Sequence, residues 1–371
     1  MHVVLIGGQQ QSLLNFRGSL MTALIKNGHE VTAAAGESNC NLTNELRLLG
    51  VQFVDLPINR AALSPLADFL LVLKIVNLLR QKNPDILIVY TLKAVIFGCI
   101  ASKLFKKMKV YPMITGLGYS LIDKKGLKAL WLKRLILLLY RFSLTHVRTV
   151  FFQNNDDIAY FQKNRLLNVD SAFHRVMGSG VDLEKFKQIE IPKGAPKFLM
   201  IARLLKEKGV EEFVHASKAV KRQYPEAQFW IVGDIDRNPS SVSKEWLEEW
   251  KNEGSVIFFG AVADVRPYLS KCSVFVLPSY REGLPRSTLE AMATGRAVIT
   301  TDVPGCRDTV NHGVNGFLIP KENSKDLVIA MTRFIVGDSD VSIMGSESRR
   351  MAELFFDVHK VNDQIMKRLS N

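Results

Sequence analysis

The sequence has few cysteines and no long apolar run. Its apolar run at the N-terminus, Val3–Ile6, is too short for a secretory signal. No stretch approaches the roughly 18 uninterrupted apolar residues of a membrane-spanning helix. We therefore expect a protein that is made in the cytoplasm and stays there. The widely spaced cysteines indicate reduced thiols, not disulfides or a zinc site; they are Cys40, Cys99, Cys272 and Cys306.

Acidic residues are scarce in only one half of the chain. The 371 residues include 49 Lys and Arg against 36 Asp and Glu, a net charge of +13. Up to Gly178 there are 22 basic and 10 acidic residues, whereas the remainder has 27 and 26. The first half is therefore expected to face something anionic. The balance of 47% hydrophobic and 23% charged residues excludes disorder, and the length predicts about two domains.

Strand-like runs alternate with helix-length amphipathic segments such as Leu13–Lys26 and Leu66–Gln81. This alternation predicts an α/β protein with parallel, doubly wound sheets. The first set of strands is expected at Val3–Ile6, Glu30–Ala34, Gln52–Leu56, Ile86–Tyr90, Val110–Ile114 and Thr149–Gln153. The second set is expected at Lys197–Ile201, Gln228–Val232, Val256–Phe259, Val274–Leu277, Ala297–Thr301 and Gly316–Ile319. Glycine- and proline-rich segments between the sets predict two Rossmann-like domains, 1–178 and 179–355, facing a crevice.

A stretch after one strand of the second set combines carboxylates with a predicted helix start. Glu282 lies in a turn, Gly283, Leu284 and Pro285 follow, and Glu290 lies one turn into the helix. Backbone N–H groups at the start of a helix favour a phosphate. A carboxylate can accept two neighbouring hydroxyls of a sugar or ribose. The alternative for Glu290 is a capping box with Ser287.

A cationic turn follows another strand of the second set. Arg203 follows the strand, and Lys208 with Gly209 opens the next helix. Two fixed cations at a strand-to-helix turn suit a diphosphate. The alternative is a solvated basic turn.

Together these motifs resemble the family-4 retaining glycosyltransferases of GT-B fold. Arg203 and Lys208 match the family's R-x4-K pair, and Glu282 and Glu290 match its E-x7-E motif. The resemblance implies that the cations bind the departing nucleoside diphosphate and take part in catalysis. It also implies that Glu282 contacts the donor sugar, that Glu290 contacts the ribose, and that the C-terminal segment, 356–371, crosses back to the first domain.

The first half resembles family members that build bacterial polyprenyl-diphosphate-linked glycans, including N-acetylgalactosaminyltransferases. The similar segments are Asn15–Arg17, Thr91–Lys93, Thr115–Tyr119 and Phe152–Asn154. The resemblance makes Arg17, Lys93 and Gly116 candidates for binding the acceptor diphosphate, with surface cations as the alternative for Arg17 and Lys93. Many relatives carry a histidine near the reacting sugar, where this chain has Ile114–Gly116, so no catalytic base is assigned.

We expect no cofactor and no metal dependence. Asp234 and Asp236 match the D-x-D pattern that holds a metal in a different glycosyltransferase fold. Here Arg203 and Lys208 already offer neutralisation of the diphosphate.

A basic, leucine-rich segment in the first half predicts contact with a membrane. Trp131 and several leucines share it with Lys124, Lys125, Lys128 and other cations. Apolar and basic side chains interleaved in this way suit a helix at an anionic lipid surface. The alternative is a core helix with a basic outer face.

The sequence therefore predicts a transferase that moves a sugar from a nucleotide-sugar donor to a lipid-linked acceptor with retained anomeric configuration. The resemblance favours UDP and an N-acetylhexosamine, and a peripheral location on the inner face of the cell membrane. Two alternatives stay open, a soluble transferase with a small acceptor and a non-enzymatic polyanion-binding protein. No nucleic-acid recognition motif is present, so nucleic acid is not an expected partner.

Overall fold

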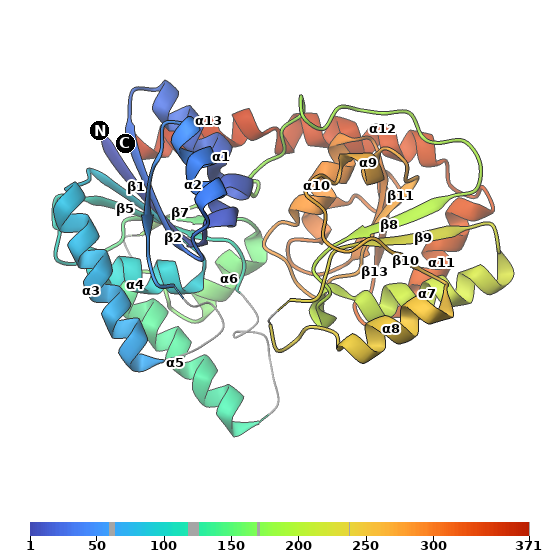
Figure 1. Cartoon of the computed structure of the whole chain (residues 1–371), viewed down its shortest axis with the longest axis horizontal. Coiled ribbons are helices and arrows are strands. Elements are labelled where there is room, and N and C mark those ends of the chain that lie inside the picture. Colours follow the sequence, from blue (N-terminus) through green and yellow to red (C-terminus); the bar gives the residue numbers. More distant parts are fainter. Residues whose placement is uncertain (59–63, 118–125, 169–170, 237, 371) are drawn as a thin grey trace. The chain divides into compact units, whose positions relative to one another are not determined.

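The computed structural model describes residues 1–58, 64–117, 126–168, 171–236 and 238–370. The chain divides into a first unit, Met1–Ser179 with Val361–Asn371, and a second unit, Gly180–Lys360 (Figure 1). Each unit is built around one parallel sheet. The expected α/β class with two Rossmann-like halves is confirmed.

The first unit has a sheet of seven strands in the order β3-β2-β1-β4-β5-β6-β7. Its strands are β1 (His2–Gln9), β2 (Glu30–Gly36), β3 (Gln52–Asp55), β4 (Ile86–Tyr90), β5 (Lys109–Ile114), β6 (Thr149–Phe152) and β7 (Ala172–Arg175). Its helices are α1 (Gln10–Lys26), α2 (Cys40–Leu48), α3 (Pro65–Lys82), α4 (Leu92–Ser102), α5 (Leu127–Ser143), α6 (Asn155–Lys163) and α13 (Val358–Leu369), the last of which begins in the second unit.

Helices cover both faces of this sheet because its strands are apolar on both sides. On one face, α3, α4, α5 and α6 form a core around buried residues such as Val89, Ile96 and Phe152. On the other face, α1 and α2 pack on the sheet together with α13, whose Val361 and Ile365 enter that core. Figure 1 shows α3, α4 and α5 on the same side of the sheet.

The second unit has six strands in the order β10-β9-β8-β11-β12-β13. They are β8 (Lys197–Ile201), β9 (Gln228–Val232), β10 (Ile257–Phe258), β11 (Val274–Leu277), β12 (Ala297–Thr301) and β13 (Gly316–Ile319). The helical elements are η2 (Lys206–Lys208), α7 (Val210–Gln223), α8 (Lys244–Glu253), α9 (Arg266–Leu269), α10 (Arg286–Ala293), η3 (Arg307–Thr309), α11 (Ser324–Ile335), α12 (Val341–Met351) and η4 (Ala352–Phe356).

Each sheet has one point at which the order of its strands reverses. In the first unit the reversal lies between β1 and β4, and in the second unit it lies between β8 and β11. Loops that leave the carboxyl ends of two such strands diverge to opposite faces, so open α/β sheets bind ligands there. The strand order alone therefore directs attention to two places, one in each unit.

Candidate functional site

The cationic turn begins at the carboxyl end of β8, beside the strand reversal of the second unit. Arg203 follows β8, Lys208 is the last residue of the short helix η2, and Gly209 precedes α7 as its N-cap, with a positive φ of 75°. A side chain at Gly209 would collide with the carbonyl oxygen of Pro278, in the loop that follows β11. Glycine therefore lets the two loops of the reversal point pack against each other.

The acidic loop lies on the other side of the reversal, between β11 and α10. Glu282 is only 13% exposed; its carboxylate pairs with Lys208 and accepts a hydrogen bond of 2.8 Å from the Ser279 hydroxyl. Gly283, Leu284 and Pro285 follow as buried residues, and α10 begins directly after Pro285. The structure therefore brings Lys208 and Glu282 together, although 74 residues separate them in the sequence.

Arg203 is also held by a carboxylate. Its guanidinium lies 2.8 Å from Asp236 Oδ2, and the Arg203 side chain is 49% exposed. The loop that carries Asp236 is fixed to the cationic turn, because Leu204 donates to the Asp234 carbonyl and Ser240 Oγ donates to Glu207. In the sequence analysis Asp236 appears only as a possible metal ligand, and its ion pair with Arg203 was not predicted. Among the described residues, no cluster of His, Cys, Asp and Glu has the composition of a metal site.

Glu290 lies in α10 and is 12% exposed. Its Oε1 lies 2.9 Å from Nε of Arg286, one turn earlier in the helix. Burial raises the pKa of Glu290, and Arg286 only partly offsets that effect. The capping-box alternative is wrong, because α10 starts at Arg286 with Pro285 as its cap and no side chain caps it. This ion pair was not predicted from the sequence, although the i, i+4 spacing of Arg286 and Glu290 would have indicated it.

The candidate acceptor residues of the first unit lie after three adjacent strands. Arg17 follows β1, Lys93 follows β4 and Gly116 follows β5. The alternative of surface cations is wrong, since Arg17 and Lys93 are both buried. The Arg17 guanidinium carbon lies 5.1 Å from the centre of the Tyr90 ring, and Lys93 Nζ lies 2.6 Å from Oδ1 of Asp68 in α3.

The junction between β4 and α4 is strained. Thr91 has φ 72° and ψ 151°, a combination that a residue with a Cβ rarely adopts. Such strain costs about 1–3 kcal/mol and is concentrated at binding and catalytic sites. Its position, between the buried Tyr90 and Lys93, marks the strand reversal of the first unit as a second place where a ligand is expected.

The basic segment overlaps α5, which begins at Leu127. Trp131 is 68% exposed. The alternative of a core helix with a basic outer face does not describe α5, because leucines share the outer face with the cations. Lys124 and Lys125 lie outside the described residues, as does the side chain of Lys128. None of the helices in the described part of the chain has the length and apolarity needed to cross a bilayer.

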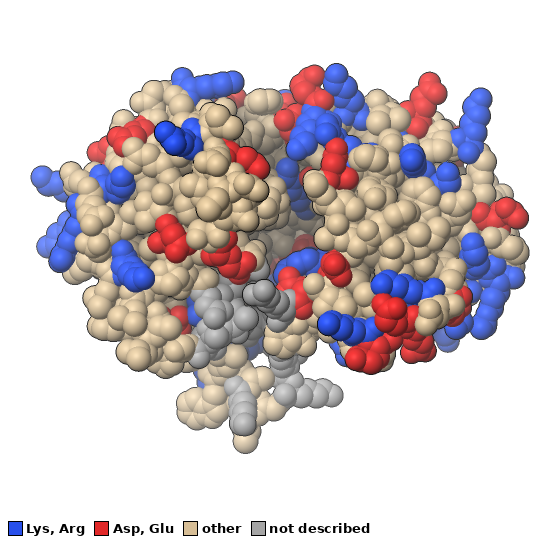
Figure 2. Space-filling model, viewed as in Figure 1, with Lys and Arg blue, Asp and Glu red and all other residues tan. Residues whose placement is uncertain are grey.

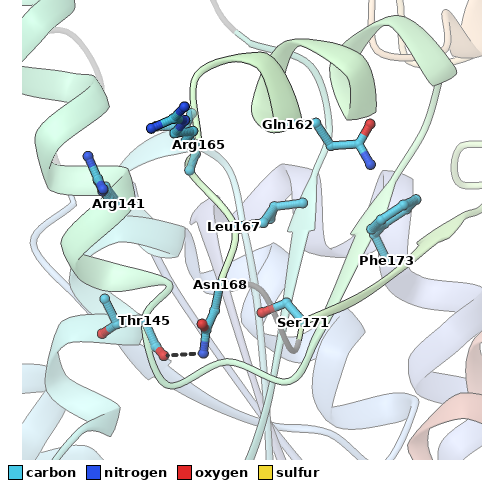
Figure 3. Close-up of a pocket in the computed structure, with 9 residues that line it drawn as sticks. Arg141, Thr145, Gln162, Arg165, Leu167, Asn168, Ser171 and Phe173 are labelled. Atoms are coloured by element: carbon cyan, nitrogen blue, oxygen red, sulfur yellow. Dashed lines mark hydrogen bonds between the residues drawn. The ribbon is translucent and has the colours of Figure 1, made fainter.

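A pocket of about 580 Å³ in the first unit contains none of the predicted site residues. Figure 3 shows it between the end of α5 and the segment that connects α6 to β7, with Asn168 donating to the Thr145 carbonyl. Thr145 and Ser171 precede β6 and β7, so the pocket lies at the amino edge of the sheet. Open α/β sheets bind their ligands at the opposite edge. We do not assign the active site to this pocket.

Two Rossmann-like units, with cations and carboxylates gathered at the strand reversal of the second, are the architecture of a GT-B glycosyltransferase. The family described as "Glycosyl transferases group 1" matches residues 181–351, and "Glycosyl transferase 4-like" matches residues 4–154. The chain belongs to this family of glycosyltransferases. Family membership also decides against the non-enzymatic polyanion-binding alternative.

Relatives of known activity cover most of the chain. The N,N'-diacetylbacillosaminyl-diphospho-undecaprenol alpha-1,3-N-acetylgalactosaminyltransferase of Campylobacter jejuni is 32% identical over 85% of this chain and 84% of its own length. The UDP-Gal:alpha-D-GlcNAc-diphosphoundecaprenol alpha-1,3-galactosyltransferase of Escherichia coli is 26% identical over 82% of this chain and 79% of its own.

Solved structures share the fold along the whole chain. Sucrose-phosphate synthase from Thermosynechococcus elongatus has a TM-score of 0.80 at 18% identity, over 100% of this chain and 98% of that one. HepE from Anabaena in complex with UDP-glucose has a TM-score of 0.77 at 19% identity, over 100% of this chain and 99% of that one. At these identities the similarity shows the GT-B fold alone.

Proposed function

We propose that the chain transfers an N-acetylhexosamine from a UDP-sugar to a polyprenyl-diphosphate-linked saccharide, with retained anomeric configuration, in the assembly of a bacterial surface glycan or glycoprotein. The observation that mainly supports the proposal is the contact between Lys208 and Glu282, a cation and a carboxylate at one strand reversal. The names of the two relatives supply the class of substrate, since both act on acceptors linked to diphospho-undecaprenol.

The second unit would bind the donor. Negative charge accumulates on the departing diphosphate as the bond to the sugar breaks, and positioned cations stabilise that charge best when they need no reorganisation. Glu282 and Asp236 hold Lys208 and Arg203 in place before the donor arrives. Gly283, Leu284 and Pro285 lead into α10, and backbone N–H groups at this helix start would offer further contacts to the diphosphate, whereas Pro285 itself has no N–H to donate. Glu290 would accept hydrogen bonds from the ribose hydroxyls.

The first unit would bind the acceptor. Arg17 and Lys93 lie after the two strands at the reversal of its sheet, and Gly116, with φ 119°, follows the next strand. On acceptor binding, Lys93 would exchange its contact with the Asp68 carboxylate for a contact with the diphosphate. We also propose that Lys124, Lys125, Lys128 and Trp131 bring α5 to an anionic membrane surface, which would make the protein peripheral on the inner face of the membrane.

The decisive experiment is a transfer assay with purified protein and labelled UDP-sugars. One acceptor is a monosaccharide linked to polyprenyl diphosphate, and the other is the same monosaccharide in free form. We expect transfer to the lipid-linked acceptor only, with the anomeric configuration of the product read by NMR. Equal transfer to the free sugar would instead support the soluble transferase with a small acceptor. Absence of transfer to both acceptors with every donor would refute the proposed function.

A further inference from the structure

Helix α3 exposes a stripe of large apolar side chains in its N-terminal half. Leu66 is 72% exposed, and Phe69, Leu70 and Leu73 are each about half exposed or more. Their spacing of three, four and seven residues puts them on one face of the helix, while Leu71, Ile75 and Leu79 enter the core. Single exposed apolar residues are common on proteins, but a continuous apolar patch indicates a surface that contacts something.

Helix α5 exposes a second stripe on the same side of the sheet. It consists of Leu127, Leu130, Trp131, Leu135, Leu138 and Phe142. Helix α4 packs against both α3 and α5 and is itself almost entirely buried. Both outer helices begin at the carboxyl edge of the sheet, because each follows a parallel strand. The exposed apolar residues of α3 all lie in its N-terminal half, near that edge, where the N-terminal part of the α5 stripe also lies.

The charges around the two stripes are almost all positive. Helices α3, α4 and α5 contain one acidic residue, Asp68, and its carboxylate is paired with Lys93. Lys74, Arg134 and Arg141 belong to the two outer helices, and Lys103 Nζ lies 3.4 Å from the centre of the Phe142 ring. Figure 2 shows a largely uncharged area over the N-terminal end of α3. Apolar side chains bordered by cations match the acyl boundary and the headgroups of an anionic bilayer.

We propose that the N-terminal half of α3 inserts into the interfacial region of an anionic bilayer beside α5. The contact then spans two helices, and the carboxyl edge of the first sheet faces the membrane. This inference rests on the proposed function, since a diphosphate carried by a membrane lipid must reach Arg17 and Lys93 at that edge. If a single helix made the contact, the first unit could tilt about that helix on the bilayer. Contact through two helices, both packed on α4, fixes the orientation of the unit relative to the membrane.

The first test replaces the stripe without touching the core. The variant Leu66→Ser, Phe69→Ser, Leu73→Ser is compared with a control in which exposed helical residues elsewhere are changed, Leu48→Ser, Ile329→Ser, Ile343→Ser. Binding to phosphatidylethanolamine–phosphatidylglycerol vesicles is measured at about 1 M salt, where the Debye length is about 3 Å and charge contributes little. We expect the α3 variant to bind at least about tenfold more weakly than wild type and the control to bind as wild type does.

Two results would overturn the proposal. One is vesicle binding by the α3 variant that equals wild type at every salt concentration. The other is a wild-type dimer that the α3 variant dissociates on gel filtration, because the stripe would then be covered by a second copy. Transfer to a short water-soluble acceptor measures the proposed function separately, and we expect the α3 variant to retain it. If the α3 variant loses vesicle binding but retains transfer to the soluble acceptor, the result supports α3 as a membrane contact. If wild type shows no transfer at all, the result refutes only the proposed enzymatic function.

A second test reports the position of the helix directly. Phe69→Trp in a Trp131→Phe background adds a tryptophan to α3, and the remaining tryptophans, Trp230, Trp246 and Trp250, all belong to the second unit. The Trp131→Phe protein is the control for their emission. We expect vesicles to shift the emission of the added tryptophan to the blue, and brominated phosphatidylglycerol to quench it. Emission that vesicles leave unchanged, although the protein is bound, would refute insertion of α3.

Discussion

In the second unit the cations of the candidate site lie against carboxylates, whereas helices α3 to α5 of the first unit carry many cations and one acid. Arg203 pairs with Asp236, Lys208 with Glu282 and Arg286 with Glu290. Paired charges are held at defined positions, which suits recognition of one diphosphate atom by atom. Unbalanced charges on a surface suit a diffuse anionic partner, and salt screens them readily. The difference agrees with our proposals that the second unit binds the donor diphosphate and that helices of the first unit contact a membrane.

The largest effect is expected from Lys208. Lys208→Ala removes the cation nearest the acidic loop and leaves the Glu282 carboxylate, which is mostly buried, without its ion pair. We expect turnover to fall by about 10²- to 10³-fold, the usual cost of losing one positioned donor to a developing negative charge.

Arg203→Ala removes a half-exposed cation, so we expect it mainly to weaken UDP binding, by about 1.5–3 kcal/mol. Steady-state rates and calorimetry with UDP measure the two effects.

Lys206→Ala is the matched control for this comparison. Lys206 belongs to the same short helix as Lys208, but its Nζ lies 4.7 Å from the centre of the Trp246 ring. We expect its rate and UDP affinity to match wild type. If Lys206→Ala and Lys208→Ala were equally impaired, the effect would come from net charge, and the assignment of Lys208 to the leaving group would be wrong.

The next effect concerns attachment. A triple variant should bind anionic vesicles at physiological salt more weakly, by up to about 3 kcal/mol, since each cation near such a surface contributes about 1 kcal/mol. Its substitutions are Lys124→Gln, Lys125→Gln and Lys128→Gln. Salt should weaken wild-type binding in the same direction, and the apolar stripes should leave a salt-resistant remainder. The control changes three exposed lysines of the second unit, Lys187, Lys193 and Lys325. Equal loss in both triple variants would mean that overall charge, and not α5, binds the vesicle.

A smaller effect should separate the two glutamates. Glu290→Gln should weaken UDP binding by about 1.5 kcal/mol, because its proposed partner is the ribose. Glu282→Gln should retain UDP binding and lower turnover, because its proposed partner is the sugar and because Lys208 remains available to the diphosphate. Calorimetry with UDP and transfer rates with the UDP-sugar distinguish these outcomes. Equal loss of UDP affinity in both variants would contradict the division of roles.

Most of the fold could be predicted from the sequence, because each buried parallel strand appears in the sequence as a short apolar run. The strand that was missed, β7 at Ala172–Arg175, is an edge strand with two exposed residues and a mixed sequence. Its pairing with β6 depends on the sheet that is already formed, and no local pattern of its own identifies it.

The candidate site could be predicted only in part. The motifs identified Arg203, Lys208, Glu282 and Glu290, but they did not predict which charges pair with one another. Asp236 lies 33 residues after Arg203, and Asp68 lies on a different helix from Lys93. Such partners are brought together by strand order and helix packing, which residue types at fixed spacing do not encode. The pair of Arg286 and Glu290 differs, because its i, i+4 spacing on one helix is a local feature that the sequence contains, although we did not predict the pair from it.

The smallest effect is a pH dependence that distinguishes a buried carboxylate from an exposed one. Burial raises the pKa of Glu290 above that of an ordinary glutamate, about 4.3, and Arg286 opposes the change. Because the folded protein binds this proton more tightly than the unfolded chain, the contribution of Glu290 to stability is full at low pH. It is lost as pH rises through the raised pKa. The proposed donor binding has the opposite sign, since an ionised carboxylate would accept hydrogen bonds from both ribose hydroxyls and the protonated form would accept fewer.

We therefore expect the affinity for a UDP-sugar to decline by a few-fold as the pH falls from neutral into the acidic range, and to begin declining at a higher pH than an exposed glutamate would allow. The UDP-sugar is the suitable ligand because its diphosphate is esterified at both ends and does not titrate in this range. Arg286→Ala should move the decline to still higher pH, because it removes the cation that favours the ionised form. Glu290→Gln should abolish the decline. Calorimetric titrations of the three proteins across this range would measure it, and a decline that persists unchanged in Glu290→Gln would show that another group binds the proton.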